Sequence, residues 1–185
     1  HLCDRRQRQM CIRDRDYTVE KTDIAQILFE IRKESNPCSL CSKMRRGALN
    51  GVLKQKGFGK LALGHHADDV VETFLLSMCF EGRLNTFAPK SFMSRTGIAV
   101  IRPMVFIDER DIAAYAKNLP VVHNPCPADK HTQREYMKTL LKKIQEDIPF
   151  AKDRITAAVM HPERYNLWDK AEEKFIADKS NGEPD

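Results

Sequence analysis

The pattern that most constrains this fold is an apolar strand followed directly by a helix, and the chain shows it twice. Residues 60–64 are expected to form a buried strand, and residues 67–80 follow with apolar positions at helical spacing. Residues 98–102 predict a second strand, and residues 108–118 a second amphipathic helix. Strands that alternate with helices at this spacing predict an α/β fold with a parallel sheet.

The rest of the chain supplies further elements. They are a strand at 17–21, helices at 23–33 and 38–56, a short strand at 120–123, and helices at 131–147 and 151–168. In the helix at 38–56 the inward positions are expected to be Leu40, Met44, Leu49, Val52 and Leu53. Gly57 is expected to end that helix. Residues 82–97, with two glycines and a proline, are expected to form a loop.

Length and composition predict a globular protein with a real core. The 185 residues suit one domain, with 42% hydrophobic and 31% charged residues. No apolar run reaches the roughly 18 residues of a membrane span. The start also lacks the apolar segment of a secretory signal. A cytoplasmic protein without membrane contact is therefore expected.

The first fifteen residues distort the net charge of +5, because they hold five arginines against two aspartates. One interpretation is a basic arm that binds nucleic acid. The interpretation we favour is a non-native prefix, since its amino-acid sequence resembles a translated sequencing adapter. The expected organisation is therefore a non-native or disordered prefix at 1–15, the main domain at 16–170, and a helix end with its tail at 171–185.

Three cysteines are the first group of residues that can carry chemistry. Cys38 and Cys41 form a Cys-x-x-Cys at a helix start, where the helix dipole favours the thiolate. Cys126 lies alone in Asn-Pro-Cys-Pro-Ala-Asp, whereas Cys79 falls in an apolar helix and is expected in the core. A redox pair, a zinc site and an iron–sulfur site all stay open. The iron–sulfur site is favoured, because zinc usually shows a second cysteine or histidine pair.

The second group follows the strand at 60–64 and reads Gly64-His65-His66-Ala67-Asp68-Asp69. In parallel sheets ligands bind beyond the carboxyl ends of strands, and Gly64 lets the backbone pass close to one. The next helix begins where its free amides can face phosphate oxygens. Asp68 and Glu72 share one helical face, as do Asp69 and Thr73. The plain alternative is that acids in a first turn only favour the helix dipole, and that both histidines are packing or capping residues.

At this point the motifs together resemble a known family. The segment Asn-Pro-Cys-Ser-Leu-Cys-Ser-Lys-Met-Arg-Arg-Gly at 36–47, then Leu-Ala-Leu-Gly-His-His-Ala-Asp-Asp-Val-Val-Glu-Thr at 61–73, resembles the tRNA 2-thiocytidine synthetase (TtcA) family. That family is part of the PP-loop ATP pyrophosphatase superfamily. Ile-Arg-Pro at 101–103 and the segment 126–135 extend the resemblance, which covers residues 17–165. It implies the adenine nucleotide alpha-hydrolase-like fold, with helices at the C-terminal end.

The resemblance implies ATP- and magnesium-dependent thiolation of tRNA. ATP adenylates the C2 oxygen of cytidine 32, and sulfur then displaces AMP. The implied ligands of a [4Fe–4S] cluster are Cys38, Cys41 and Cys126. The implied catalytic residues are Asp68, Asp69 and Arg45, and the implied nucleotide-binding residues are Gly64, His65, His66 and Asp68. Arg45 and Arg46, one turn beyond Cys41, are expected to steady phosphate or the sulfur-bearing intermediate. The implied partners are tRNA, a cysteine desulfurase or other sulfur donor, and a second copy of the chain.

One feature of the superfamily is missing from the sequence. The phosphate loop Ser-Gly-Gly-x-Asp-Ser needs adjacent glycines, and this chain has none. We therefore expect a truncated chain that lacks the first strands and the loop. Because a cradle of backbone amides cannot be replaced by distant side chains, these residues alone are not expected to hydrolyse ATP productively.

A basic stripe is the candidate contact with RNA. Arg134, Lys138 and Lys142 recur every four residues on one face of a helix, where they can follow phosphates or simply face solvent. Two other functions stay open. A 2-thiouridine-type thiolase would keep the three cysteines, whereas a lysidine synthetase would lack them. A non-catalytic RNA-binding module would hold zinc and no labile sulfide.

Overall fold

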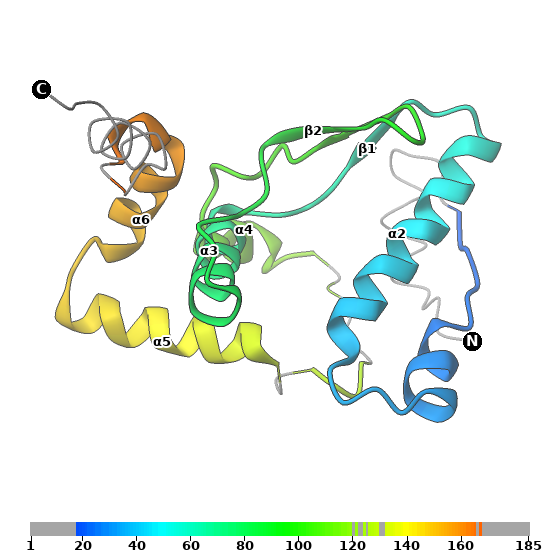
Figure 1. The fold of residues 1–185 in the computed structure, drawn as a ribbon, viewed down its shortest axis with the longest axis horizontal. Coiled ribbons are helices and arrows are strands. Elements are labelled where there is room, and N and C mark those ends of the chain that lie inside the picture. The colour runs from blue at the N-terminus through cyan, green and yellow to red at the C-terminus, as the bar shows by residue number, and fades with distance from the viewer. Residues whose placement is uncertain are drawn as a thin grey trace, which may run out of the picture.

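The computed structural model describes residues 18–119, 121, 124, 126–129, 132–165 and 167 (Figure 1). In chain order the elements are η1 (Gln26–Ile31, a π-helix), α2 (Pro37–Gln55), β1 (Lys60–Ala62), α3 (Ala67–Glu81), β2 (Lys90–Met93), β3 (Ile98–Ile101), α4 (Glu109–Ala116), α5 (Gln133–Asp147), α6 (Ala151–Met160) and η2 (Pro162–Arg164, a 3-10 helix). The prefix at 1–15, the tail at 171–185 and most of the strand expected at 120–123 lie outside the described residues.

The sheet has three strands in the order β1-β3-β2. β1 runs parallel to β3, with Leu61 opposite Val100, which confirms the expected parallel pair. β2 runs antiparallel to β3, with Phe92 opposite Ala99, so the loop predicted for 82–97 is wrong over 90–93. Gly97, at a φ of 70°, closes the tight turn between the two strands.

Burial follows position in the sheet. β3 lies in the middle of the described strands, and its Ile98 and Val100 are buried. β1 was expected to be the buried strand, but Lys60 and Ala62 are exposed and Leu61 is only half-buried. That expectation is wrong because no described strand pairs with the outer edge of β1.

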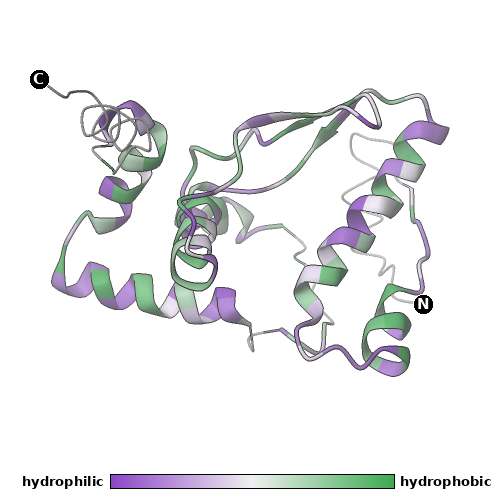
Figure 2. Ribbon diagram, viewed as in Figure 1, coloured by the Kyte–Doolittle hydropathy of each residue, from purple (hydrophilic) through white to green (hydrophobic). Residues whose placement is uncertain are grey.

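The core lies where α3 meets α5 and α6 (Figure 1). It contains Val71 and Leu75 from α3, and Met137 and Leu141 from α5. Figure 2 shows apolar and polar residues alternating along α5, as expected for a helix with one buried face. The helices predicted at 67–80 and 131–147 are confirmed, whereas the one predicted at 151–168 ends at Met160 because Pro162 cannot continue it.

α2 is confirmed as a helix, but its packing is not the one expected. Pro37 stands in its first turn, and Gly57, at a φ of 69°, follows its end. No residue of α2 is buried, and Leu49, expected inward, is 41% exposed. Among the described elements, the main contacts of α2 are with η1. Both lie at the opposite end of the molecule from α5 and α6 (Figure 1).

The first described residues differ from the prediction in part. Residues 18–21 form no strand, whereas the helix expected at 23–33 is present and includes η1. Leu28 anchors η1 and is 1% exposed. Within the described part of the chain, no helix has the length and apolar character needed to cross a membrane.

Candidate active site

The candidate site lies at the carboxyl edge of the parallel strands. β1 leads through Leu63, whose N–H donates to Ile101 O at 2.9 Å, into Gly64 and the start of α3. β3 ends at the same edge and is followed by Arg102. A Cβ atom on Gly64 would lie 3.3 Å from Met104 Cε, so the chain passes close to its neighbour here. The two strand ends therefore lie side by side at the carboxyl edge of the sheet, where the sequence predicted that a ligand binds.

His66 and Asp69 shape the first turn of α3. His66 is the N-cap residue, and its backbone N–H donates to Asp69 Oδ2 at 3.0 Å. The other oxygen, Asp69 Oδ1, lies 3.4 Å from Arg134 Nη1. The helix-start interpretation of these acids thus holds for Asp69, which keeps one oxygen only loosely engaged.

Both oxygens of Asp68 are engaged by its own chain. Oδ2 accepts the backbone N–H of Glu109 at 2.7 Å, and Oδ1 lies 3.0 Å from Lys152 Nζ. Lys152 is 9% exposed and also lies 2.9 Å from Asp108 Oδ1. Burial tends to raise the pKa of Asp68, but these hydrogen bonds and the ammonium group outweigh it and lower that pKa. Asp68 therefore fastens α3 to α4 and α6, a role that sequence reasoning missed.

Arg134 reaches from α5 into the acidic end of α3. Its Nη1 lies 3.0 Å from Glu72 Oε2, and its Nη2 donates to Thr73 Oγ1 at 3.0 Å. Glu72 is 4% exposed, and burial raises its pKa although Arg134 opposes that rise. The guanidinium thus faces acids of its own chain.

The other two members of the basic stripe differ from Arg134 and from each other. Lys138 Nζ lies 2.7 Å from Glu109 Oε1, an ion pair close to half exposed on each side. Lys142 is exposed. Two of the three residues proposed for RNA contact are therefore already paired within the molecule.

The three cysteines come from distant parts of the chain. Cys38 and Cys41 lie in the first turns of α2, and Cys126 lies in a turn where its N–H donates to Asn124 Oδ1 at 3.2 Å. Cys38 and Cys126 are exposed and Cys41 is half-buried. Burial raises the pKa of Cys38, and Cys126 and Cys41 raise it further, which is the opposite of the thiolate-favouring effect expected at a helix start.

The donor set fits an iron–sulfur cluster in its chemistry. Three thiols are the soft ligands that such a cluster takes. Among the described residues, no group of three His, Cys, Asp or Glu side chains is arranged to hold a metal ion. A four-iron cluster is wider than one ion, so its cysteines need not converge on a point. Cys79 was expected in the core, but it is exposed, so that expectation is wrong.

The side chains of His65, Phe87 and Arg102 come together beside Asp69. The ring of His65 lies 4.8 Å from that of Phe87, and Arg102 Cζ lies 4.8 Å from the centre of the same ring. Burial lowers the pKa of His65. Asp69 opposes this effect, whereas the charges of Arg102 and Arg134 lower the pKa further. Its buried Nδ1 has no hydrogen-bond partner among the described residues. Sequence reasoning assigned no role to Phe87 or Arg102, although Arg102 falls within the Ile-Arg-Pro motif.

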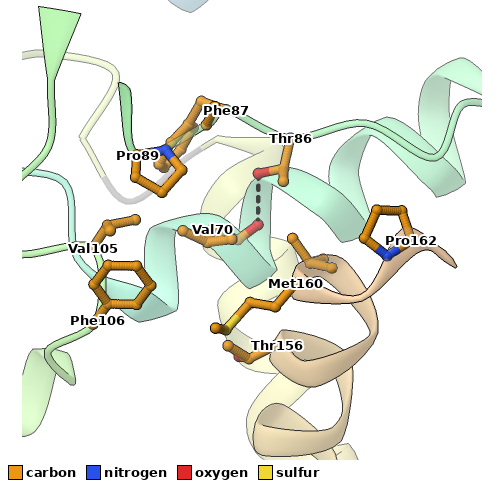
Figure 3. A pocket seen from close by; sticks show the side chains of 11 residues that line it. Val70, Thr86, Phe87, Pro89, Val105, Phe106, Thr156, Met160 and Pro162 are labelled. Atoms are coloured by element: carbon orange, nitrogen blue, oxygen red, sulfur yellow. Dashed lines mark hydrogen bonds between the residues drawn. The ribbon is translucent and has the colours of Figure 1, made fainter. Parts of the chain in front are cut away.

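A cavity of about 490 Å³ has Phe87 in its lining (Figure 3). Its lining is mostly apolar and includes Val70, Val105, Phe106 and Met160. Among the residues that the structure describes, no titratable side chain lines it. The cavity therefore offers apolar contact and no acid–base group.

The comparisons with known proteins identify the family of the chain. The model of the PP-loop domain family matches residues 5–145. The chain belongs to the PP-loop family. Among solved structures, this PP-loop chain is similar to the U34-tRNA thiolase NcsA from Methanococcus maripaludis with its [4Fe-4S] cluster, at a TM-score of 0.65 and 22% identity, over 88% of this chain and 56% of that one. The nucleotide alpha-hydrolase-like fold is thereby confirmed.

Curated relatives carry one shared name. The chain is 38% identical to the tRNA-cytidine(32) 2-sulfurtransferase of Syntrophotalea carbinolica, over 85% of this chain and 62% of the relative. It is 39% identical to the enzyme of that name from Dichelobacter nodosus, over 77% of this chain and 55% of the relative. The chain thus spans about three fifths of the length of the relatives that it matches.

Proposed function

We propose that this PP-loop protein serves in the ATP-dependent 2-thiolation of tRNA at cytidine 32, with sulfur passed through a [4Fe–4S] cluster. The observation that carries the proposal is that Cys38 lies within electrostatic range of both Cys41 and Cys126, in a chain whose α3 begins with Asp68 and Asp69 at the carboxyl edge of the sheet. The names of the curated relatives support the same substrate.

The nucleotide belongs at the start of α3. Gly64 leaves room for a phosphate to approach the backbone closely, whereas the amides of Ala67 and Asp69 in the first turn already donate to Ile107 O and to the side chain of His66. Asp69 is the better candidate for Mg²⁺, because Arg134 holds its Oδ1 only at 3.4 Å. Asp68 acts mainly by holding the helix in place, since both its oxygens are bound.

The cysteines belong to the sulfur step. Cys38, Cys41 and Cys126 would hold the cluster, which would supply the place where sulfur is bound for transfer. Arg134 binds Glu72 at 3.0 Å, and its charge also lowers the pKa of Cys38 against the larger effect of burial. Arg45 is exposed on α2, one helical turn after Cys41, and is the candidate residue for contact with the adenylated base.

The wider setting is part of the same proposal. The sulfur comes from a cysteine desulfurase or another donor, and the protein acts as a homodimer in the cytoplasm. Because the 185 residues contain no adjacent glycines for a phosphate loop, we expect the chain alone to bind tRNA without productive ATP turnover.

Nucleoside analysis tests the proposal. The parts of the S. carbinolica relative that fall outside the match are joined to this chain, and the chimera is expressed in a strain that lacks its own cytidine-32 thiolase. We expect 2-thiocytidine in tRNA from the chimera and none from the chain alone or from a Cys126→Ala chimera. Formation of 2-thiouridine would assign another base. No thiolated nucleoside from a folded, cluster-loaded chimera would contradict the proposal.

A further inference from the structure

The loop that leads into β2 is held by hydrogen bonds from two sides. Thr86 Oγ1 donates to Val70 O at 3.0 Å, which ties the loop to α3 (Figure 3). Arg102 ties it to the end of β3, because its Nη1 donates to Ala88 O at 2.7 Å and its backbone N–H donates to Pro89 O at 2.9 Å. The loop is therefore fastened to both elements that flank the carboxyl edge of the sheet.

The guanidinium of Arg102 serves this loop. Its Cζ lies 4.8 Å from the centre of the Phe87 ring, so the positive charge faces the π-electrons of that ring. Within the described part of the chain Arg102 forms no salt bridge, whereas Arg134 and Lys152 both bind carboxylates. The contacts of the Arg102 side chain there thus fix the loop and its aromatic residue.

His65 depends on Phe87 for the position of its ring. The two ring centres are 4.8 Å apart, and the ring planes are tilted by 46°. The buried Nδ1 of His65 has no hydrogen-bond partner among the described residues. Because no hydrogen bond at Nδ1 fixes the imidazole there, its packing against Phe87 decides how the ring lies.

These contacts connect the ends of the two parallel strands. Arg102 follows β3 directly, and His65 follows Gly64 after the end of β1. Phe87 lies against both side chains. A group that binds a ligand has to be held to within about 0.5 Å of its productive position, so whatever fixes the His65 ring also affects the ligand.

We propose that Arg102 is a positioning residue of the nucleotide site, which holds Phe87 against His65 and thereby fixes the imidazole ring in place for ATP. The inference rests on the proposed function, because it takes His65 as a contact of the nucleotide. It also gives a role to the Ile-Arg-Pro motif at 101–103, since the arginine of that motif is the residue that binds the loop.

Histidine-selective NMR tests the positioning in the full 185-residue chain. His65→Gln assigns the signal, and Phe87→Leu gives its position without the ring current of Phe87. We expect Arg102→Met to move the His65 ring protons toward that reference, and Arg102→Lys to return part of the shift, since a lysine can still donate to Ala88 O. Arg95→Met, at an exposed position in the turn between β2 and β3, is the matched control and should leave the signal in place.

ATP kinetics test the link to the nucleotide in the chimera that carries the phosphate loop. We expect Arg102→Met and Phe87→Leu to raise KM for ATP roughly 5- to 10-fold, with kcat changed by less than about 2-fold. A purely structural role would lower the amount of active enzyme, and so the apparent kcat, and would leave KM unchanged. Phe87→Leu keeps the hydrogen bonds of Arg102, so it tests this step even where Arg102→Met does not fold.

The outcomes separate the inference from the proposed function. Wild-type His65 signals in Arg102→Met, or an unchanged KM for ATP in Phe87→Leu, would overturn the inference and leave the proposed function standing. A raised KM for tRNA with an unchanged KM for ATP would assign the three side chains to RNA, and would overturn the inference as well. A folded, cluster-loaded chimera that forms no thiolated nucleoside would overturn both.

Discussion

Lys152 and Asp68 are 84 residues apart in the chain, yet Lys152 Nζ lies 3.0 Å from Asp68 Oδ1. The same ammonium group lies 2.9 Å from Asp108 Oδ1. One buried cation shared by two carboxylates therefore joins α6 to the start of α3 and to the residue before α4. The match to the PP-loop family ends at residue 145, so this support of the site comes from outside the matched residues.

Lys152→Met is expected to destabilise the protein by about 3 kcal/mol, because it leaves two carboxylates in a largely buried place without their cation. Urea denaturation measures the loss. Lys143→Met, an exposed position on α5, is the control and should change stability by less than about 0.5 kcal/mol. Equal losses in the two variants would show that the buried ion pair contributes nothing.

Asp68→Asn is expected to reduce stability in a way that depends on pH. The folded pKa of Asp68 lies below its ordinary value of 3.8, so its contribution is present above that pH and is lost as the pH falls through the folded pKa. We expect a deficit of about 2 kcal/mol at pH 7 that narrows below about pH 4. Glu72 titrates in both proteins and cancels in the difference. A deficit that stays constant in acid would contradict this account.

Arg134→Met is expected to cost about 2 kcal/mol, because Glu72 then stays buried without its cation. Arg134→Lys should restore part of the loss, since one ammonium cannot bind Glu72 and Thr73 as the guanidinium does. Thermal unfolding measures both variants. Lys142→Met, two helical turns further along α5, serves as the control, and a loss there equal to that of Arg134→Met would remove the special role of Arg134.

Gly64→Ala is expected to cost less than about 1 kcal/mol, because the new Cβ meets only the flexible end of Met104, at 3.3 Å. The larger effect is expected on nucleotide binding, because the methyl group enters the space where the nucleotide is proposed to bind. Denaturation and ATP binding in the chimera separate the two effects. A loss above about 2 kcal/mol would mean that Gly64 serves the fold.

The sequence predicted the helices well where a long apolar period marks them, as in α3 and α5. It missed β2, because Lys90 to Met93 acquires its strand form by pairing with β3. It also misjudged burial in β1 and α2. Apolar residues there predict a buried face, but the elements around them decide whether anything covers it.

The candidate site was predictable only where neighbours in sequence form it. The cluster from Gly64 to Asp69 follows from a strand end and a helix start. The bond from Lys152 to Asp68 bridges 84 residues, and no local pattern announces it. Arg134 shows the opposite case. Its spacing with Lys138 correctly predicted a shared helix face, but could not tell that acids of the same chain lie against both residues.

The central claim is that Cys38, Cys41 and Cys126 together hold an iron–sulfur cluster, and a count of iron and labile sulfide tests it most directly. The chain is purified without oxygen and reconstituted beside Cys126→Ala and Cys79→Ala, the second an exposed cysteine of α3 that serves as the control. We predict about four iron and four sulfide ions per chain in the wild type and in Cys79→Ala, and a loss of both in Cys126→Ala. Zinc without labile sulfide, or a cluster that survives in Cys126→Ala, would contradict the claim.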